Sequence, residues 1–439
     1  MTGRVKSNRI ELVGGMLILF AFCLMSGACG PDPRDVAFLA SWSPDGSRAA
    51  LVPNYVLEEK LPSGLWIYDS RTGLTEQIVS LGENLVCSHP KWSPEGDELL
   101  FAVLESPDSE HSDDEGKQMP YSINVVGVDG RNLREVAQSV SAESDFSAFL
   151  TENAVMWGPV PGTIIFQEGA GGKANAVELN LETGIRRQFL PGSADAYVIA
   201  PSPDRRSVAA LLFDEESRLT RLYVADFALA NWQLVETLEI APRRFEEFES
   251  IVFWSPDSSC FAVPEVLDRT AGAEKPLAVI RVREARTGAL QAGFAADPDS
   301  AILWNRESTS IVFSEPSSGG VSRIYCADLS GGSIRLIVSG NDYHLLSWNH
   351  EDNRIYFFRA VDGSEGEEQG NNTPERRLFS CAPDGKRAQM LGRLIYDEED
   401  LLWNLSPDGI RIVAFGSPSN AGIVNLTTGE LVMITMRAD

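Results

Sequence analysis

The feature that most restricts the fold of this chain is a unit that recurs eight times along the sequence. Each unit opens with an apolar or aromatic residue, continues through a turn of the Ser-Pro-Asp-Gly kind and enters an almost unbroken apolar strand. Successive units begin about 44 to 65 residues apart, a period typical of structural repeats. The eight units begin at Trp42, Trp92, Trp157, Pro201, Trp254, Trp304, Trp348 and Leu405.

Each unit has a second half with its own pattern, in which two apolar strands flank a turn rich in Asp, Asn, Thr and Gly. In the first unit this half reads LWIYDSRTGLTEQIV from Leu65, and in the last it reads GIVNLTTGELVMI from Gly422. First and second halves alternate strictly along the chain. A unit therefore predicts four short antiparallel strands, and their repetition predicts an all-β protein.

The first turn of each unit has a physical explanation. Proline presets φ for the second position, the Asp carboxylate accepts bonds from nearby backbone N–H groups, and glycine adopts the positive φ that closes a hairpin. The strand that follows, such as LLFAV at residues 99–103, has the continuous apolar character of a strand covered on both faces. The tryptophan before the turn is expected to fill the space between neighbouring units as a core aromatic.

This combination of turn and apolar strand resembles the repeat of the TolB propeller and of the propeller domains of prolyl-oligopeptidase-type peptidases. The resemblance implies an all-β fold, a single WD40-like β-propeller of four-stranded antiparallel blades over residues 35–439. TolB-type propellers have six blades, whereas the units here predict eight. Seven is the alternative, because several turns are degenerate. The repeats are expected near 36–80, 86–137, 152–190, 196–240, 248–295, 300–338, 343–391 and 400–436.

The first 28 residues are typical of an export signal. Three basic residues precede the apolar stretch 12–25, which is short for a bilayer span, and Ser26-Gly27-Ala28 supplies small residues before Cys29. The segment resembles the lipobox of bacterial lipoproteins, although Ser26 stands where that family usually has an aliphatic residue.

The resemblance implies a lipid on Cys29, a short tether over 29–34 and a place in the cell envelope, facing the periplasm or the cell surface. Ordinary secretory cleavage and an uncleaved anchor are the alternatives. Gly30 resembles the pattern of lipoproteins sent to an outer membrane. The predicted partners are the membrane, through this anchor, and other envelope proteins.

The chain is acidic, with a formal net charge of −26 at pH 7. Such a surface repels phosphate backbones, so nucleic-acid binding is not expected, whereas basic partners and divalent cations are compatible with it. In a four-stranded blade, the 1–2 and 3–4 turns share one face, which looks structural here because those turns are short and uniform. The 2–3 connections and the links between blades lie on the other face and vary in length, as binding loops do.

Two acidic segments on that variable face are candidate sites. Five of the six acids in the segment 105–120 could gather Ca²⁺, although no dedicated calcium-loop spacing is present and a solvated loop is the alternative. No other cofactor is predicted. The segment before the last repeat is a candidate partner-binding site. The calcium candidates are Asp108, Glu110, Asp113, Asp114 and Glu115, and the partner-binding candidates are Asp397, Glu398, Glu399 and Asp400.

Searches for catalytic motifs find no GxSxG nucleophile elbow, no HExxH, no Walker loop and no Rossmann fingerprint. The glycine-rich stretch at 169–173 is expected to be a hairpin. The cysteines have no CxxC pair, and their spacing selects none of the three pairings that four cysteines allow, so they are interpreted as small buried side chains. These cysteines are Cys87, Cys260, Cys326 and Cys381.

The sequence therefore predicts a non-catalytic envelope scaffold that binds another protein through its variable-loop face. The alternative is a propeller enzyme, or a protein that binds a metal or small ligand at the mouth of the central channel, where ligands come from several blades without a local motif. His89 and His344 precede inner strands and could approach the channel. Acids near the starts of inner strands are Asp145, Glu249, Asp299, Asp342 and Asp400.

Overall fold

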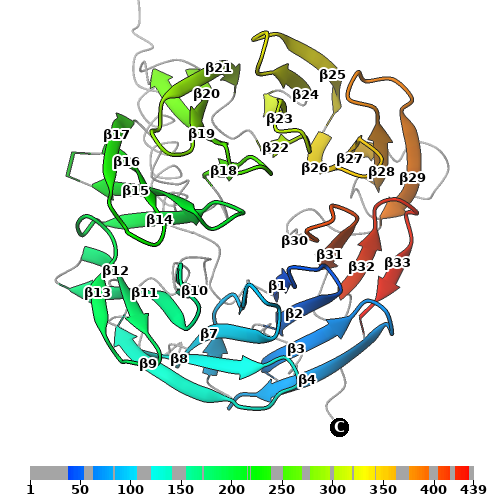
Figure 1. Ribbon diagram of the computed structural model, residues 1–439. Helices are drawn as coiled ribbons and strands as arrows, with labels where there is room; N and C mark the ends of the chain where they lie inside the picture. The colour runs from blue at the N-terminus through cyan, green and yellow to red at the C-terminus, as the bar shows by residue number, and fades with distance from the viewer. Residues whose placement is uncertain are drawn as a thin grey trace, which may run out of the picture.

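The protein is a ring of eight blades, each an antiparallel sheet whose strands follow one another from the central channel to the perimeter (Figure 1). The computed structural model confirms the all-β propeller and eight blades, not seven. It describes residues 38–53, 63–82, 85–105, 120–140, 155–170, 173–214, 216–217, 219–238, 251–268, 277–296, 301–318, 321–341, 343–361, 375–394, 404–415 and 421–434. Within these ranges no helix is long and apolar enough to serve as a membrane span.

The first four blades take up the N-terminal half of the chain. Blade 1 contains β1 (Phe38–Trp42), β2 (Arg48–Pro53), β3 (Gly64–Asp69) and β4 (Leu74–Ser80). Blade 2 contains β5 (Leu85–Cys87), β6 (Lys91–Trp92), β7 (Glu98–Glu105), β8 (Pro120–Gly127) and β9 (Arg134–Val140). Blade 3 contains β10 (Val155–Trp157), β11 (Thr163–Ala170), β12 (Lys173–Asn180) and β13 (Arg186–Gln188). Blade 4 contains β14 (Ala196–Pro201), β15 (Ser207–Asp214), β16 (Leu219–Asp226) and β17 (Gln233–Leu238).

The other four blades complete the ring. Blade 5 contains β18 (Phe253–Trp254), β19 (Cys260–Asp268), β20 (Leu277–Glu284) and β21 (Leu290–Ala296). Blade 6 contains β22 (Ile302–Trp304), β23 (Ser310–Ser318), β24 (Val321–Asp328) and β25 (Ile334–Asn341). Blade 7 contains β26 (Tyr343–Asn349), β27 (Arg354–Val361), β28 (Glu375–Cys381) and β29 (Gln389–Leu394). Blade 8 contains β30 (Asn404–Leu405), β31 (Arg411–Phe415), β32 (Ala421–Asn425) and β33 (Leu431–Met433).

Blade 2 departs from the regular pattern because its innermost strand is in two pieces, β5 and β6, which both pair with β7. The interruption contains Pro90, which has no N–H to donate to a strand ladder. Beside it, the Ser88 hydroxyl accepts a hydrogen bond from the Ala102 N–H at 2.9 Å, and the Ser88 N–H donates to the Ala102 carbonyl at the same distance. His89, which lies between Ser88 and Pro90 in the chain, is thereby placed against the channel.

The core consists of apolar layers between neighbouring blades. The second strand of each blade is covered on both faces, as its unbroken apolar run predicts, and Leu99, Leu100 and Ala102 of β7 are fully buried. Each buried cluster lies at a blade–blade boundary, which we call a seam. Blades 1 and 8 are each formed from contiguous chain, so their seam has no shared strand. It is closed by packing of Trp42 and Trp66 against Val413 and Ile423.

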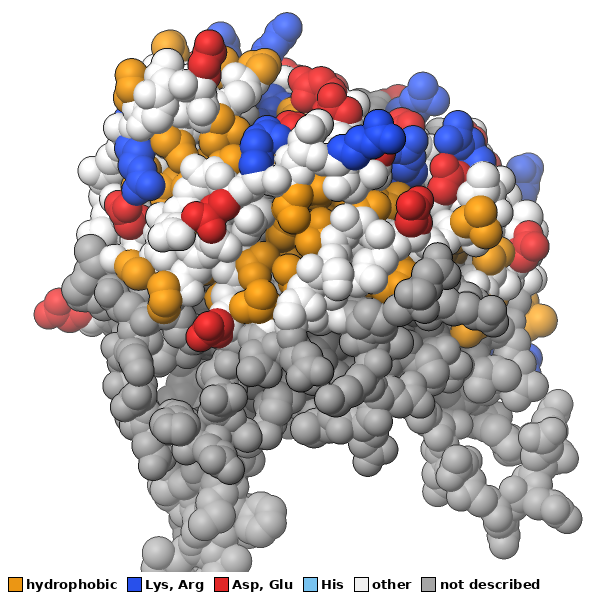
Figure 2. Space-filling model, turned by 90° about the horizontal axis from the view of Figure 1, so that it is seen from below, with side chains coloured by type: hydrophobic (Ala, Val, Ile, Leu, Met, Phe, Trp, Pro, Cys, Tyr) orange, Lys and Arg blue, Asp and Glu red, His pale blue; other side chains and the backbone are white. Residues whose placement is uncertain are grey.

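The ring has two unlike faces, which we name by their connections. The turn face carries the 1–2 and 3–4 turns, and the link face carries the strand ends that lead to 2–3 connections and to the next blade. Seen from the side of β4 and β9, charged side chains of both signs gather along one edge of the ring, and apolar side chains are exposed between the outer strands (Figure 2). The exposed apolar residues of these blades include Leu74 and Leu133.

Each of the eight 1–2 turns, including those whose sequence is degenerate, contains one residue with a positive φ. In six blades this residue is the fourth after the start of the unit, and in blades 3 and 7 it is the fifth. Four of these residues are not glycine, although a side chain at positive φ costs about 1–2 kcal/mol. The eight are Gly46, Gly96, Gly162, Arg205, Ser258, Ser308, Asn353 and Gly409.

The four non-glycine residues at this position each make a side-chain hydrogen bond that glycine lacks. The Ser258 hydroxyl accepts the N–H of Asp204 in the preceding blade at 3.0 Å, and the Ser308 hydroxyl accepts that of Asp257 at 3.2 Å. The Asn353 carbonyl oxygen accepts the indole N–H of Trp348 at 2.8 Å. The Arg205 guanidinium donates to the Trp157 carbonyl at 3.0 Å, so three of the four bonds reach the preceding blade and that of Asn353 stays within its own. Each bond can offset part of the backbone strain.

Candidate binding site

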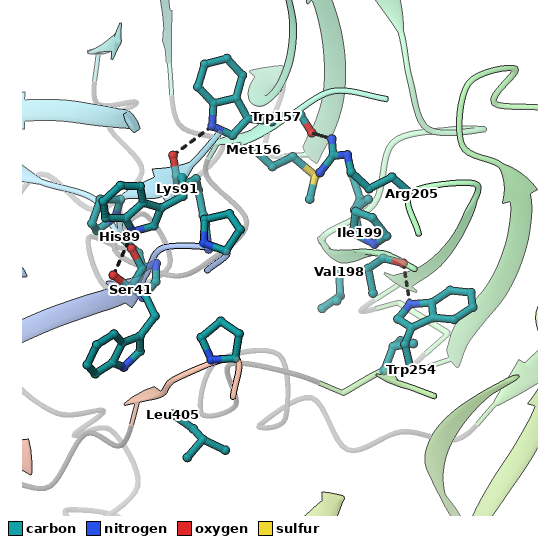
Figure 3. A pocket seen from close by; sticks show the side chains of 18 residues that line it. Ser41, His89, Lys91, Met156, Trp157, Val198, Ile199, Arg205, Trp254 and Leu405 are labelled. Carbon is teal, nitrogen blue, oxygen red and sulfur yellow. Dashed lines mark hydrogen bonds between the residues drawn. The ribbon is translucent and has the colours of Figure 1, made fainter. Parts of the chain in front are cut away.

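The inner strands surround a cavity of about 510 Å³ where the central channel opens on the turn face (Figure 3). Six of the eight blades contribute to its wall. We call it the channel-mouth cavity. Its lining residues are Ser41, Trp42, Pro44, His89, Pro90, Lys91, Trp92, Met156, Trp157, Val198, Ile199, Ala200, Pro201, Arg205, Val252, Trp254, Leu405 and Pro407.

The tryptophans of this wall also hold neighbouring blades together. Trp92, Trp157 and Trp254 of this wall, and Trp304 outside it, each donate the indole N–H to a backbone carbonyl of the preceding blade. The acceptor is the residue just before the equivalent motif position. The prediction that these tryptophans fill the space between blades is therefore confirmed, and their only ring donors are occupied. The four bonds, all at 2.9 Å, run from Trp92 to Ser41, from Trp157 to Lys91, from Trp254 to Ala200 and from Trp304 to Phe253.

Other side chains take over this role where the motif tryptophan is missing or turned away. Blade 4 has Pro201 at that position, and the Arg205 guanidinium instead donates to the carbonyls of Trp157, at 3.0 Å, and Gly158. In blade 7 Trp348 bonds within its own blade, and the His350 ring nitrogen Nε2 lies 3.1 Å from the Trp304 carbonyl. These substitutions place basic side chains at the channel.

The channel-mouth cavity is basic, although the protein as a whole is acidic. Its ionisable lining residues are Lys91, Arg205 and His89, and no carboxylate is among the described residues that line it. Burial lowers the pKa of the Arg205 guanidinium, an effect opposed by the nearby carboxylate of Glu95. The Arg205 side chain also lies over Phe227, with its guanidinium carbon 5.3 Å from the ring centroid. It is a half-buried cation in a fixed position.

A second cavity of about 320 Å³ lies on the other side of the channel, against blades 5 to 8. It shares Trp254 and Leu405 with the first cavity. Its carboxylate, Asp408, accepts hydrogen bonds from the Ser406 hydroxyl and from the Arg411 guanidinium, the latter at 2.7 Å. Burial raises the pKa of Asp408, but these hydrogen bonds lower it by a larger amount, so the net shift is downward. That charge is neutralised inside its own turn.

The other 1–2 turns bind their aspartates in the same way. Asp45 accepts the Ser43 hydroxyl at 2.6 Å and the Ser47 N–H at 3.0 Å, and these bonds lower its pKa to about 2, with the Ser43 bond the largest cause. Equivalent hydroxyl bonds hold Asp204 and Asp257, at 2.7 Å each. These four aspartates are therefore structural, as the sequence predicted for this kind of turn.

Most of the residues predicted as sites lie outside the described part of the chain. These are the proposed lipid attachment residue, the calcium and partner-binding candidates and the acids near the starts of inner strands. They are Cys29, Asp108, Glu110, Asp113, Asp114, Glu115, Asp397, Glu398, Glu399, Asp400, Asp145, Glu249, Asp299 and Asp342. In the part that the structure does describe, no three His, Cys, Asp or Glu side chains are grouped to hold a metal ion.

The histidines and cysteines within the described residues have definite places. His89 reaches the channel, as predicted, and its Nε2 lies 2.9 Å from the Ala40 carbonyl. His344 is exposed on β26 and lines neither cavity. The four cysteines are free thiols, three of them buried and Cys260 half-buried, and burial raises the pKa of Cys381 to about 11. The interpretation as small buried side chains holds for three of the four.

The sequence analysis named the channel mouth as an alternative site, with His89 near it, but did not place Lys91 or Arg205 there. The turn face was expected to be structural, but its inner rim encloses this space. The available signals were Pro201 in place of tryptophan and Arg205 in place of glycine, two departures from one repeat. Neither shows by itself which other blades complete the wall.

These features define the chain as an eight-bladed β-propeller protein with an apolar, basic opening at its channel. No family model matches it, and no curated protein sequence does. The Dos1 propeller resembles it with a TM-score of 0.54 and 10% identity, over 88% of this chain and 91% of that one. Dipeptidyl peptidase 4 from Porphyromonas gingivalis resembles it with a TM-score of 0.56 and 12% identity.

The match to that peptidase covers 98% of this chain but only 62% of the peptidase. TolB from Acinetobacter baumannii is also similar, with a TM-score of 0.36 and 13% identity over 77% of this chain and 71% of that one. The eight blades and the likeness to the Dos1 propeller confirm the propeller fold predicted from the sequence. At these identities the likeness extends to fold alone, and propellers support many unrelated activities.

Proposed function

We propose that this chain is a non-catalytic interaction module of the cell envelope that binds another envelope protein through its link face. The observation that carries the proposal is the unequal use of carboxylates on the two faces. On the turn face, Asp45, Asp204, Asp257 and Asp408 are held by hydrogen bonds within their own turns. Most of the net charge of −26 comes from the 2–3 connections and blade links, whose flanking strands end on the link face.

Charge of one sign on one face favours a partner with a basic surface, because complementary potentials steer encounter and exclude wrong partners. A lipid on Cys29 would also restrict where the partner protein lies. The few residues between Cys29 and Phe38 reach at most about 30 Å when fully extended, and β1 starts at its link-face end. The anchor would therefore hold the link face toward the bilayer, so the partner is a membrane-proximal protein with a basic surface.

In-cell crosslinking tests the proposal with three forms of the protein. The intact chain should crosslink to one or a few envelope proteins. Reversing the charge of Asp397, Glu398, Glu399 and Asp400 to Lys should reduce that crosslink about tenfold or more, as expected when several complementary charges are lost. The matched control reverses Glu182 and Glu430, which are exposed in 3–4 turns on the opposite face.

Cys29→Ser supplies the third form and tests the anchor. Loss of the lipid should release the protein from the membrane fraction and weaken the same crosslink. A partner that stays bound to both the charge-reversed form and Cys29→Ser would refute the link-face proposal.

A metal or small-ligand site at the channel is the second candidate function, since the cavity is of ligand size. Metal analysis of the purified protein separates the two. A stoichiometric divalent ion would favour this candidate over a scaffold.

A further inference from the structure

We propose that the channel-mouth cavity on the turn face binds an acidic peptide segment of a partner protein. The inference concerns a different face from the proposed function and goes beyond it. It rests on the sign of the charge at the cavity, on the fixed position of one of its cations and on the apolar character of the remaining wall.

The first step is the reversal of charge. The protein has a net charge of −26, yet the described residues that line this opening include the cations Lys91 and Arg205 and no carboxylate. Interactions between exposed charges fall off over about 8 Å at physiological salt, so a ligand responds mainly to the charges that it approaches closely. A ligand that contacts this part of the wall therefore meets positive charge.

The second step is the position of the Arg205 guanidinium. Its bonds to the Trp157 and Gly158 carbonyls and its contact with the Phe227 ring fix the side chain at the wall. Only Nη2 makes these two bonds, and a guanidinium has five N–H donors in a rigid fork. A carboxylate is the group that such a fork matches best. Because the cation is already ordered and partly desolvated, binding loses little side-chain entropy there.

The third step is the remainder of the wall, which favours a peptide over a small anion. Met156, Ile199 and Leu405 line the opening together with several prolines (Figure 3). Three of the four indole N–H groups of the wall, those of Trp92, Trp157 and Trp254, are bonded to backbone carbonyls. A volume of about 510 Å³ falls within the range of ligand pockets. A segment with both carboxylates and apolar side chains satisfies the cations and the apolar wall together.

The carboxylates near the opening do not overturn this reading. Glu95, which acts on Arg205, is exposed in the 1–2 turn of blade 2 and is not among the lining residues. Asp45 and Asp408 are bound within their own turns. Removal of the Glu95 charge should therefore strengthen binding of a negative ligand.

Fluorescence anisotropy of labelled peptides with the purified full chain provides the test. The probes are a peptide of alternating Leu and Glu, and the same peptide with Lys in place of Glu. The acidic peptide should bind, more weakly as salt is raised, and the basic peptide should not. Lys91→Gln and Arg205→Gln should each weaken binding about tenfold, and Glu95→Gln should strengthen it about threefold, as loss of one favourable or unfavourable charge contact predicts.

Arg286→Gln is the matched control, because Arg286 is an 84% exposed turn-face arginine outside the cavity, and it should leave binding unchanged. Arg205→Gln also removes a contact between blades, so its thermal midpoint is measured alongside, and Lys91→Gln carries the test if that midpoint falls. Equal binding of both peptides, or no effect of Lys91→Gln, would overturn the proposal. Displacement of the acidic peptide by anionic vesicles would also overturn it, in favour of a lipid surface. None of these results bears on the link-face crosslink.

Discussion

The seam between blades 5 and 6 and the seam between blades 7 and 8 are built differently. At the first, Trp304 donates its indole N–H to the Phe253 carbonyl and is 5% exposed. At the second, Leu405 occupies the equivalent position, and the contact is a bond from the Ser347 hydroxyl to the Gly409 carbonyl at 3.1 Å. The ring therefore keeps a polar contact between blades at both seams, but only the first has the motif tryptophan. At the second, the buried aromatics Tyr356 and Phe358 come from β27 instead.

Two further seams also differ in the side chain that bonds across them. Arg205 bonds across the seam between blades 3 and 4, and Trp254 bonds across the seam between blades 4 and 5. A repeat protein is stabilised largely by the interfaces between neighbours, so a weak unit can persist between strong ones. Two of the substitutions, Arg205 and His350, also place basic side chains at the channel. We infer that the departures from the repeat are the places where this scaffold acquired its individual chemistry.

Truncation of the two motif residues should show the largest difference between the seams. Trp304→Ala removes a buried aromatic and should lower the free energy of unfolding by about 3–5 kcal/mol. Leu405→Ala removes a half-buried aliphatic side chain and should cost about 1–2 kcal/mol. Urea-induced unfolding followed by circular dichroism measures both. Equal losses would show that the two seams contribute alike.

Smaller effects are expected at the positive-φ positions of the turns. Ser308→Ala keeps the strained conformation and loses the bond from the Asp257 N–H, which should cost about 1 kcal/mol. Ser308→Gly loses the same bond but relieves the strain, so its net effect should be close to zero. Gly46→Ala is the control for strain alone, because its added Cβ would meet the nearest atom at an ordinary 3.5 Å. If Ser308→Gly proved as costly as Ser308→Ala, the strain argument would fail.

The smallest effect concerns acid stability of the turn face. Because the Ser43 hydroxyl and the Ser47 N–H hold the pKa of Asp45 at about 2, below its ordinary value, the folded state is favoured when this group is ionised. That contribution is present above about pH 4 and is lost as pH falls toward 2. Asp45→Asn should therefore show a shallower loss of thermal midpoint over this window. The group is exposed, so we expect a shift of a degree or so. Parallel curves would indicate that Asp45 contributes nothing.

Much of the architecture could be read from the sequence because its causes are local. A turn such as residues 43–47 and the apolar strand after it are contiguous, and their pattern needs no knowledge of distant residues. The tryptophans were correctly placed between blades for the same reason, since an aromatic beside a turn that recurs eight times must pack against its neighbours. The degenerate turns were harder, yet each keeps one residue at positive φ because Ser258, Ser308 and Asn353 replace glycine with compensating hydrogen bonds.

The sequence by itself determined the all-β class, the eight units and the general position of their tryptophans. Only the tertiary structure decided that Arg205 substitutes for an indole donor, that an interrupted inner strand brings His89 to the channel, and that Lys91 lies at the same opening as Arg205. The reason is that a turn or a strand depends on neighbours in the chain, whereas a cavity at a ring centre depends on which side chains from separate blades converge. Convergence of that kind is fixed by ring closure and is not encoded in any single repeat.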